Sequence, residues 1–321
     1  MVDNGEDAVR VRLDFGYDGS AFSGWALQPG LRTVQDELED ALAKVLRPPS
    51  AIGLERAEAG SALPASGLHL PLGADRPNPG YRLTVAGRTD AGVHARRQVA
   101  HLDVPLANWA QLPGRSDRAP ATALLDRLTA VLPDDIAVNS VAIVPPGFDA
   151  RFSAGSRRYA YRIADSPGAR DALTSQYVLR WRRALDVGLM NEASRMLVGL
   201  HDFAAFCRPR PDATTIRRLI TFAWRRPTTG PDQGLAVATI RADAFCHNMV
   251  RALVGAAIKV GEGKESVTWP SEVLLSRRRD LAAAIVPPHG LTLEEVTYPP
   301  PPFAAERALI IRAKRKLAEK S

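Results

Sequence analysis

Cysteine is scarce in this chain of 321 residues, and long apolar runs are missing. The two cysteines, Cys207 and Cys246, are too few for a disulfide framework and cannot by themselves form a four-ligand zinc site. No stretch reaches the ~18 uncharged apolar residues of a membrane span. The N-terminal segment, MVDNGEDAVR, is acidic and polar, unlike a secretory signal peptide. We therefore expect a cytoplasmic globular protein with reduced thiols and no membrane partner.

Positive charge is present in excess and is unevenly placed. The net charge is +7, and 45% of the residues are hydrophobic, enough for a sizeable core in two domains. Residues 1–100 carry a net charge of −2, whereas residues 101–321 carry +9. A basic half indicates an anionic partner, most commonly nucleic acid. The alternative is that the many arginines reflect genome composition alone.

The hydrophobic pattern predicts strands and helices in both halves of the chain. Thr33 is the expected N-cap of the first helix, with Asp36 three residues later. Alternating residues predict strands, and apolar residues at three- and four-residue spacing predict helices. The predicted strands are 10–17, 81–86, 98–104, 136–144, 157–163, 217–225 and 234–242, and the predicted helices are 34–46, 121–132, 186–199, 247–260 and 271–280.

Two α+β domains account for this order of elements. We expect antiparallel strands with helices on one sheet face, in domains 1–145 and 146–298. Residues 48–80, rich in Pro and Gly, have no clear period and are interpreted as a flexible insertion. A Pro-rich linker and a basic, helix-compatible tail occupy residues 299–321; the tail is either a solvated helix or arm, or a contact to RNA.

The segment from Gly87 to Ala95, GRTDAGVHA, is the most informative stretch for chemistry. Small residues around Asp90 allow another molecule to approach the backbone closely. Arg88 lies two residues earlier, and in extended geometry both side chains would point to one face. Because a neighbouring arginine favours the ionised carboxylate, Asp90 is a candidate nucleophile. The alternative is an Asx-turn aspartate with a salt-bridged arginine.

Five segments in the same order resemble the tRNA pseudouridine synthase A family, over residues 11 to about 298. Phe22, Ala26 and Asn248 depart from the family's common Tyr, Gln and His. The matching segments are Tyr17-Asp18-Gly19 with Gly24-Trp25, Thr33-Val34-Gln35 and Leu38-Glu39; Gly87–Ala95; Phe148–Ser153 with Arg157-Arg158-Tyr159 and Tyr161; His201-Asp202-Phe203 with Phe206; and Phe245, His247, Met249, Val250 and Arg251.

The resemblance implies two ferredoxin-like α+β halves, whose sheets meet around a basic central cleft. It also implies isomerisation of uridine to pseudouridine at positions 38, 39 and 40 in the tRNA anticodon stem-loop. The N-glycosidic bond breaks, the uracil rotates, and C5 bonds to C1′ of the ribose. The resemblance implies a homodimer, and neither a metal nor a redox cofactor is expected.

The resemblance also implies roles for individual residues. Asp90 would be the nucleophile, and Arg88 and Arg251 would hold it ionised and oriented. Tyr159 would stack on the uracil, and its hydroxyl would assist removal of the C5 proton. Arg157 and Arg158 would contact phosphates.

Other interpretations of these residues stay open. Tyr159 could be a core aromatic, since Tyr161 shares its face. Arg251, in an apolar helix, either pairs with a carboxylate or lies on the exposed stripe. The cysteines are interpreted as buried or inert thiols. As alternatives to the isomerase, we consider a non-catalytic RNA-binding protein on the same scaffold and an unrelated hydrolase that pairs Asp90 with a second carboxylate.

Overall fold

The computed structural model describes residues 7–46, 80–209, 214–301 and 303–318. Almost all of the expected insertion at 48–80 therefore lies outside the described residues. Within them, one ten-stranded sheet runs through the molecule in the order β4-β1-β3-β10-β5-β9-β8-β7, with β2 paired to β3 and β6 paired to β5. The strands are β1 (Ala8–Tyr17), β2 (Thr84–Val85), β3 (His94–Pro105), β4 (Ile136–Ile143), β5 (Ser156–Ala164), β6 (Leu179–Arg180), β7 (Gly199–Asp202), β8 (Ile216–Arg225), β9 (Ala236–Ala242) and β10 (Leu291–Thr297).

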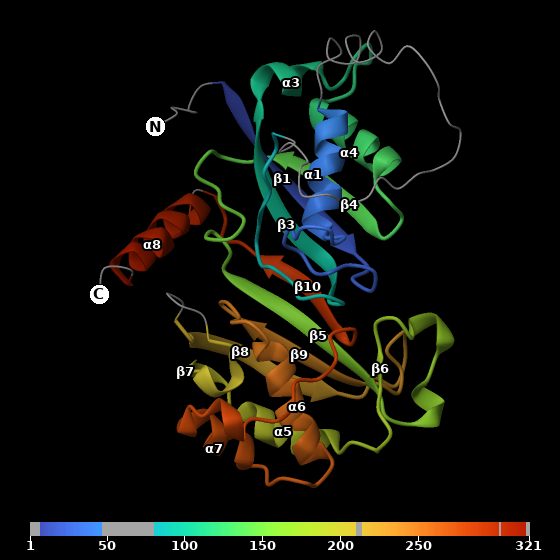
Figure 1. Ribbon diagram of the computed structural model, residues 1–321, viewed down its shortest axis with the longest axis vertical. Coiled ribbons are helices and arrows are strands. Elements are labelled where there is room, and N and C mark those ends of the chain that lie inside the picture. Colours follow the sequence, from blue (N-terminus) through green and yellow to red (C-terminus); the bar gives the residue numbers. More distant parts are fainter. Residues whose placement is uncertain (1–6, 47–79, 210–213, 302, 319–321) are drawn as a thin grey trace.

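Two groups of helices pack at the two ends of this sheet, and the last helix stands apart beside its middle (Figure 1). One group accompanies β1, β3 and β4, and the other accompanies β5, β8 and β9. The α-helices are α1 (Val34–Val45), α3 (Leu106–Gln111), α4 (Pro120–Val131), α5 (Val187–Arg195), α6 (Met249–Gly261), α7 (Trp269–Ser276) and α8 (Phe303–Ala318). Four short 3-10 helices complete the structure, at Pro167–Ala169, Ala172–Thr174, Ala204–Phe206 and Arg279–Leu281.

Local sequence signals explain the first strand and helix. Along β1, Val11, Leu13 and Phe15 are fully buried and alternate with half-buried neighbours, as the period-2 pattern predicts. The Asp36 backbone N–H donates to Thr33 Oγ1 at 3.4 Å, so the predicted N-cap of α1 is confirmed. Most predicted strands and helices recur close to their expected bounds, whereas the strand predicted at 81–86 is reduced to Thr84–Val85 and the helix predicted at 186–199 ends at Arg195. The α+β class is confirmed.

β10 was not predicted, and it joins the two halves into one sheet. It pairs in parallel with β3 through Thr292 and Leu293, and it pairs antiparallel with β5 along most of its length. The expected sheets of the two halves therefore meet as one continuous sheet, because this central strand hydrogen-bonds to both neighbours, and its pairing with β3 is parallel rather than antiparallel (Figure 1). The ferredoxin-like organisation of each half and the domain bounds stay predictions. One buried apolar cluster likewise extends through both halves.

The loop assigned to residues 87–98 is also shorter than expected. β3 begins at His94, although Arg96 and Arg97 give this end a polar sequence. Pairing with β10 on one side and with β1 on the other extends the strand through these residues. Tertiary hydrogen bonding overrides local composition here.

Candidate active site

The loop that carries Asp90 is held by hydrogen bonds from both neighbouring strands. Tyr17 on β1 and Thr89 are joined through their hydroxyl oxygens at 2.7 Å, and Gln98 on β3 donates to the Gly87 carbonyl at 2.9 Å. A turn follows, in which the Val93 N–H donates to the Asp90 carbonyl at 3.2 Å. Gly92 in this turn has φ +74°, a conformation that other L-residues rarely adopt. The backbone of Asp90 is therefore fixed before any substrate binds.

The loop after β1 packs directly on the Asp90 loop. The Trp25 N–H donates to the Thr89 carbonyl at 3.1 Å, and the Trp25 side chain is almost fully buried. Gly24 has φ +94°, and a Cβ there would lie 2.9 Å from the Thr89 carbonyl oxygen. This close approach explains why a glycine stands before Trp25 in the matching segment.

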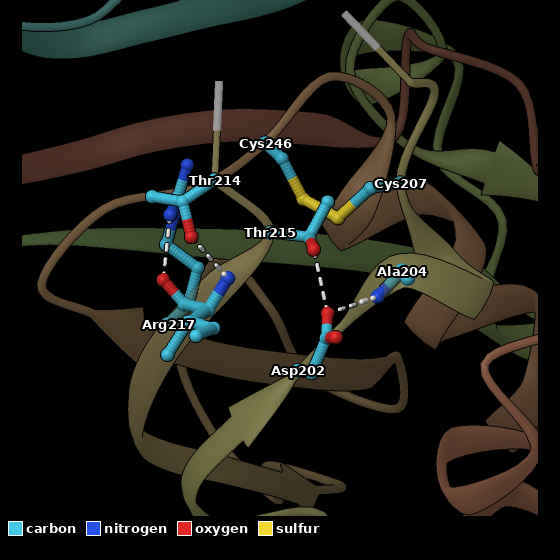
Figure 2. Close-up of a disulfide and its surroundings, with 8 residues drawn as sticks. Asp202, Ala204, Cys207, Thr214, Thr215, Arg217 and Cys246 are labelled. Atoms are coloured by element: carbon cyan, nitrogen blue, oxygen red, sulfur yellow. Dashed lines mark hydrogen bonds between the residues drawn. A yellow bond between two sulfur atoms is a disulfide. The ribbon is translucent and has the colours of Figure 1, made fainter. Parts of the chain in front are cut away.

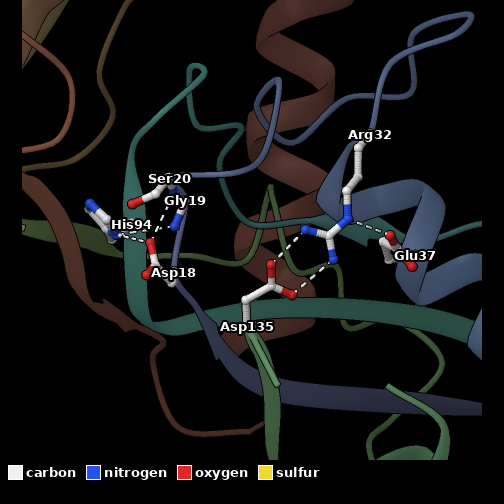
Figure 3. A network of polar contacts seen from close by, with 7 residues as sticks. All are labelled: Asp18, Gly19, Ser20, Arg32, Glu37, His94 and Asp135. Carbon is white, nitrogen blue, oxygen red and sulfur yellow. Dashed lines mark hydrogen bonds and ion pairs between the residues drawn. The ribbon is translucent and has the colours of Figure 1, made fainter. Parts of the chain in front are cut away.

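Two polar networks anchor the loop after β1 at its ends (Figure 3). Asp18 accepts a hydrogen bond from the Ser20 N–H at 2.9 Å, and its Oδ1 lies 3.1 Å from Nδ1 of His94. At the other end, the Arg32 guanidinium binds both carboxylate oxygens of Asp135, at 2.6 and 3.0 Å, and donates to Glu37 at 2.7 Å. The bidentate hydrogen bonds to Asp135 are the main cause of the raised pKa of Arg32.

Two side chains from the other half of the molecule contact the Asp90 carboxylate. His247 Nε2 lies 3.3 Å from Oδ1, and Arg251 Nη1 lies 3.6 Å from Oδ2. Arg251 also donates from Nε to the Val286 carbonyl at 2.7 Å, which fixes its side chain. Asp90 remains 34% exposed, so its carboxylate is both held and accessible. The prediction that Arg251 pairs with a carboxylate is confirmed.

His247 was not among the predicted site residues, although the resemblance included it. It lies in the turn between β9 and α6, where Asn248 adopts a left-handed conformation (φ 68°) just before the helix. This turn directs His247 and the first turn of α6 toward Asp90. The signal available in the sequence was its place in the matching segment, between Phe245 and Met249.

Arg88 lines the same cavity but does not pair with Asp90. Its side chain is exposed, and no hydrogen bond or ion pair joins it to Asp90 in the described part of the chain. In this structure His247 and Arg251, rather than Arg88, contact the Asp90 carboxylate. Arg88 remains at the rim, where a substrate group could reach it.

The carboxylate faces a cavity of about 580 Å³ that both halves of the molecule line. Asp90 and Asp243 are the acidic residues of its lining. The arginines that line it are Arg88, Arg151, Arg157, Arg208, Arg217, Arg251 and Arg307. This excess of arginine over aspartate makes the cavity attractive to a polyanion, as expected of a basic central cleft.

Tyr159 on β5 lines the cavity with a ring that is 93% covered by protein, since only 7% of the residue is exposed. Phe245 packs against it edge-to-face, with ring centroids 5.3 Å apart. Burial raises the pKa of the Tyr159 hydroxyl, and the Asp90 charge raises it further. The hydroxyl is therefore protonated near neutral pH. Tyr161, by contrast, is fully buried and donates to the Pro287 carbonyl at 2.7 Å, so it is a core residue.

The two arginines before Tyr159, Arg157 and Arg158, lie in different environments. Neither environment is the phosphate-binding one that the resemblance implied. Arg157 is buried, and its guanidinium donates to the carbonyls of Asp243, Ala86 and Arg151, each at 2.7 Å. These bonds tie the Asp90 segment to β9 and so argue against a phosphate contact. Arg158 points to the opposite face of β5, because strand side chains alternate, and pairs with Glu295 at 3.0 Å. It does not line the cavity.

A disulfide joins Cys207 and Cys246, so the expectation of two inert thiols is wrong (Figure 2). The sequence offered no pairing signal, because 39 positions separate the two cysteines and folding brings them together. Beside the bridge, Asp202 Oδ1 accepts hydrogen bonds from Thr215 Oγ1 at 2.5 Å and from the Ala204 N–H at 3.1 Å. Cys246 and Thr215 both line the cavity. The bridge therefore cross-links one wall of the site, next to His247.

The described residues were also searched for metal sites and membrane spans. Within 7–46, 80–209, 214–301 and 303–318, no group of three or more His, Cys, Asp or Glu side chains is arranged to hold a metal ion. In the same ranges, every helix is too short or too polar to pass through a bilayer.

Comparison with known proteins identifies the family to which this chain is similar. A family profile described as tRNA pseudouridine synthase matches residues 193–299, which include His247 and Arg251. The protein named tRNA pseudouridine synthase A from Streptomyces griseus subsp. griseus is 49% identical over 318 residues, covering 99% of this chain and 98% of the relative. Proteins of the same name from Frankia casuarinae and Mycobacterium leprae are 47% and 41% identical, each over 96% of both chains.

Proposed function

From the premise that the chain belongs to the tRNA pseudouridine synthase A family, and is thus a tRNA pseudouridine synthase, an isomerase, we propose its substrate site and nucleophile. The enzyme converts uridines 38, 39 and 40 of the tRNA anticodon stem-loop to pseudouridine, with Asp90 as the nucleophile. The observation that carries this proposal is an accessible carboxylate, held on both oxygens by His247 and Arg251, inside an arginine-lined cavity.

The proposed reaction needs a carboxylate that is ionised and correctly oriented. Asp90 attacks either C1′ of the ribose or C6 of the uracil, and the N-glycosidic bond breaks. The uracil rotates and C5 bonds to C1′. An Asp90 bound to C1′ leaves as this bond forms, and one bound to C6 leaves after it, so the free carboxylate is restored. Loss of the C5 proton then restores the ring, while N1 gains a proton. Substrate and product are isomers, so no electrons enter or leave. Partners on both oxygens of Asp90 limit its rotation and orient it toward the cavity.

A uridine in a stem must leave its stack before Asp90 can reach it. Unstacking costs a few kcal/mol, and an aromatic ring in the receiving cavity offsets part of that cost. Tyr159 supplies such a ring beside Asp90, fixed against Phe245. Since burial raises the pKa of Tyr159, its hydroxyl can help remove the C5 proton only if it passes on its own proton at the same time.

A hydrolase would need a second free carboxylate in the cavity. Asp243 is the candidate, but its Oδ1 accepts hydrogen bonds from the backbone N–H groups of Arg218 and Ala244, at 3.0 and 2.7 Å. Asp243 is thus engaged in holding the end of β9. This arrangement favours the isomerase, whose mechanism uses one carboxylate.

Tritium release from tRNA labelled at C5 of uridine tests the proposal, because forming the C5–C1′ bond expels the C5 hydrogen. We expect release by the wild-type protein and none by Asp90→Ala, with the variant's tRNA affinity within about tenfold of wild type, since one side chain of a large contact is removed. The control substrate carries cytidine at positions 38, 39 and 40. Turnover by Asp90→Ala, or equal release from the control tRNA, would overturn the assignment.

Two further expectations belong to this proposal. The family resemblance favours a homodimer, so light scattering should give about twice the chain mass of 34.7 kDa. We also keep the cytoplasm as the proposed location, because tRNA is modified there. A monomeric mass at micromolar concentration would contradict the dimer.

A further inference from the structure

The C-terminal helix α8 forms part of the wall of the Asp90 cavity. Ala304 and Ala308 are buried and attach the helix to the rest of the molecule. Arg307 and Ile311, which follow Ala304 and Ala308 by three residues each, line the cavity together with Asp90 and Tyr159. In Figure 1, α8 stands beside the middle of the sheet, outside the two groups of helices. The first turns of a segment that the sequence left open, between a solvated helix or arm and a contact to RNA, therefore line the cavity.

Arg307 has a positive charge that the described residues do not neutralise. Its Nε donates to the Ala154 carbonyl at 3.1 Å, and no ion pair joins it to a carboxylate within those residues. Burial is the main cause of the lowered pKa of Arg157, and the nearby positive charge of Arg307 lowers this pKa further. Because the guanidinium of Arg157 is already bonded to carbonyls, an anion bound by Arg307 is what would offset this repulsion.

The sequence adds further positive charge along the same helix. Residues 303–321 carry six basic and two acidic side chains, a net charge of +4 within a chain whose total is +7. Lys314, Arg315 and Lys316 follow Arg307 in the sequence by about two helical turns. A basic run that continues from the wall of a cavity is typical of contact with a phosphate backbone.

We propose that α8 is an RNA-binding wall of the active site, in which Arg307 binds a phosphate of the tRNA strand next to the uridine at Asp90. The basic residues that follow Arg307 in the sequence, among them Lys314, Arg315 and Lys316, add positive charge that favours the same polyanion. The inference rests on the proposed function, because it takes tRNA as the polyanion. It assigns to the helix the positioning of the strand, while Asp90 performs the chemistry.

The helix also has exposed apolar residues, Phe303, Leu309 and Ile310, which could meet a protein. The charge distribution and the position of Arg307 in the cavity favour RNA as the occupant. A second copy of the chain is the other candidate, and the test below separates the two.

The experiment measures tRNA affinity of the full-length protein over a range of salt concentrations. We compare Arg307→Gln, the triple variant Lys314→Gln/Arg315→Gln/Lys316→Gln, and the control Arg118→Gln, which removes one exposed charge outside the cavity. Glutamine is a good helix former, so α8 should persist in the variants. Thermal midpoints and molar masses are recorded for each protein.

We expect Arg307→Gln to weaken binding roughly three- to tenfold, and to reduce the slope of log K against log salt by about 0.7–0.9, as for one lost phosphate contact. The triple variant should reduce the slope by more than one such step. In turnover of tRNA, KM should rise more than kcat falls. Arg307→Lys should restore most of the affinity, and Arg118→Gln should behave as wild type.

Unchanged affinity and slope in both Arg307→Gln and the triple variant would overturn the proposal. A fall in molar mass with an unchanged slope would also overturn it and would assign α8 to a contact between copies. If Arg307→Gln fails to fold, the triple variant decides the question by itself. A wild-type protein that forms no pseudouridine overturns the proposed function instead, because the binding slopes do not depend on turnover.

Discussion

His247 and Asp90 meet across the cavity, with Nε2 of the imidazole 3.3 Å from Oδ1 of the carboxylate. Asp90 comes from the loop between β2 and β3, and His247 from the turn between β9 and α6. The two halves of the chain therefore both contribute to the candidate site. The continuous sheet holds them in register, because β10 hydrogen-bonds to β3 on one side and to β5 on the other.

This contact predicts that His247→Gln slows the reaction more than it weakens tRNA binding. The contact at 3.3 Å orients the carboxylate, and each loss of about 1.4 kcal/mol in transition-state stabilisation slows a reaction roughly tenfold, so kcat should fall roughly 10- to 100-fold. Single-turnover tritium release at saturating tRNA measures the effect. His201→Gln is the matched control, since His201 is outside the cavity and its Nε2 contacts only the Val198 carbonyl among the bonds observed. Equal rates for wild type and His247→Gln would remove His247 from the site.

The contrast between Arg157 and Arg158 predicts losses of stability that differ in size. Arg157→Leu leaves three carbonyl oxygens without their donor, and should lower the free energy of unfolding by roughly 2–4 kcal/mol. Arg158→Gln removes a partly exposed ion pair with Glu295 and should cost less than about 1 kcal/mol. Urea titrations of the two variants measure both quantities. A larger loss in Arg158→Gln than in Arg157→Leu would contradict the structure.

The disulfide predicts a redox-dependent stability. A bridge across 39 positions restricts the unfolded chain, which corresponds to about 4 kcal/mol in the chain-entropy estimate. Denaturant titration with and without dithiothreitol should show this difference in the wild-type protein. The Cys207→Ala/Cys246→Ala variant is the control and should not respond to the reductant. The prediction fails if reduction leaves the wild-type transition unchanged.

His94 predicts that stability falls in mildly acidic solution. Burial lowers the pKa of His94 while the nearby Asp18 carboxylate opposes this shift, and the Gly19 N–H donates to Nδ1 at 3.0 Å, as a neutral ring requires. The unfolded chain has a histidine pKa of about 6.5. As pH falls below that value, the unfolded state therefore binds a proton that the native state does not, and the native state loses stability.

The free energy of unfolding should accordingly decrease from about pH 6.5 toward the lower native pKa, by at most about 1.4 kcal/mol per pH unit for one proton. His94→Gln should make the decrease shallower in urea titrations between pH 7 and 5. Burial also lowers the pKa of His289, so part of the decrease should remain in the variant. A stability that rises on acidification would contradict this assignment.

Local patterns predicted most of the elements, because their signals depend on near neighbours. The alternation of Val11, Leu13 and Phe15 indicates a half-buried strand, and Thr33 before an amphipathic stretch indicates the start of a helix. β10 was missed because its seven residues, LTLEEVT, have no strong alternation. Its strand conformation depends on partners that lie far away in the sequence.

The sequence by itself determined the family, the α+β class and the identity of Asp90, Tyr159 and Arg251 as site candidates, since these follow from ordered motifs and short-range periodicity. Only the tertiary structure decided which groups contact Asp90, and that Arg157 is bonded to carbonyls while Arg158 lies on the other sheet face. It also brought Cys207 to Cys246 and Arg307 into the cavity. These relationships join residues distant in the sequence, and the folding of one sheet through both halves is what brings them within bonding distance.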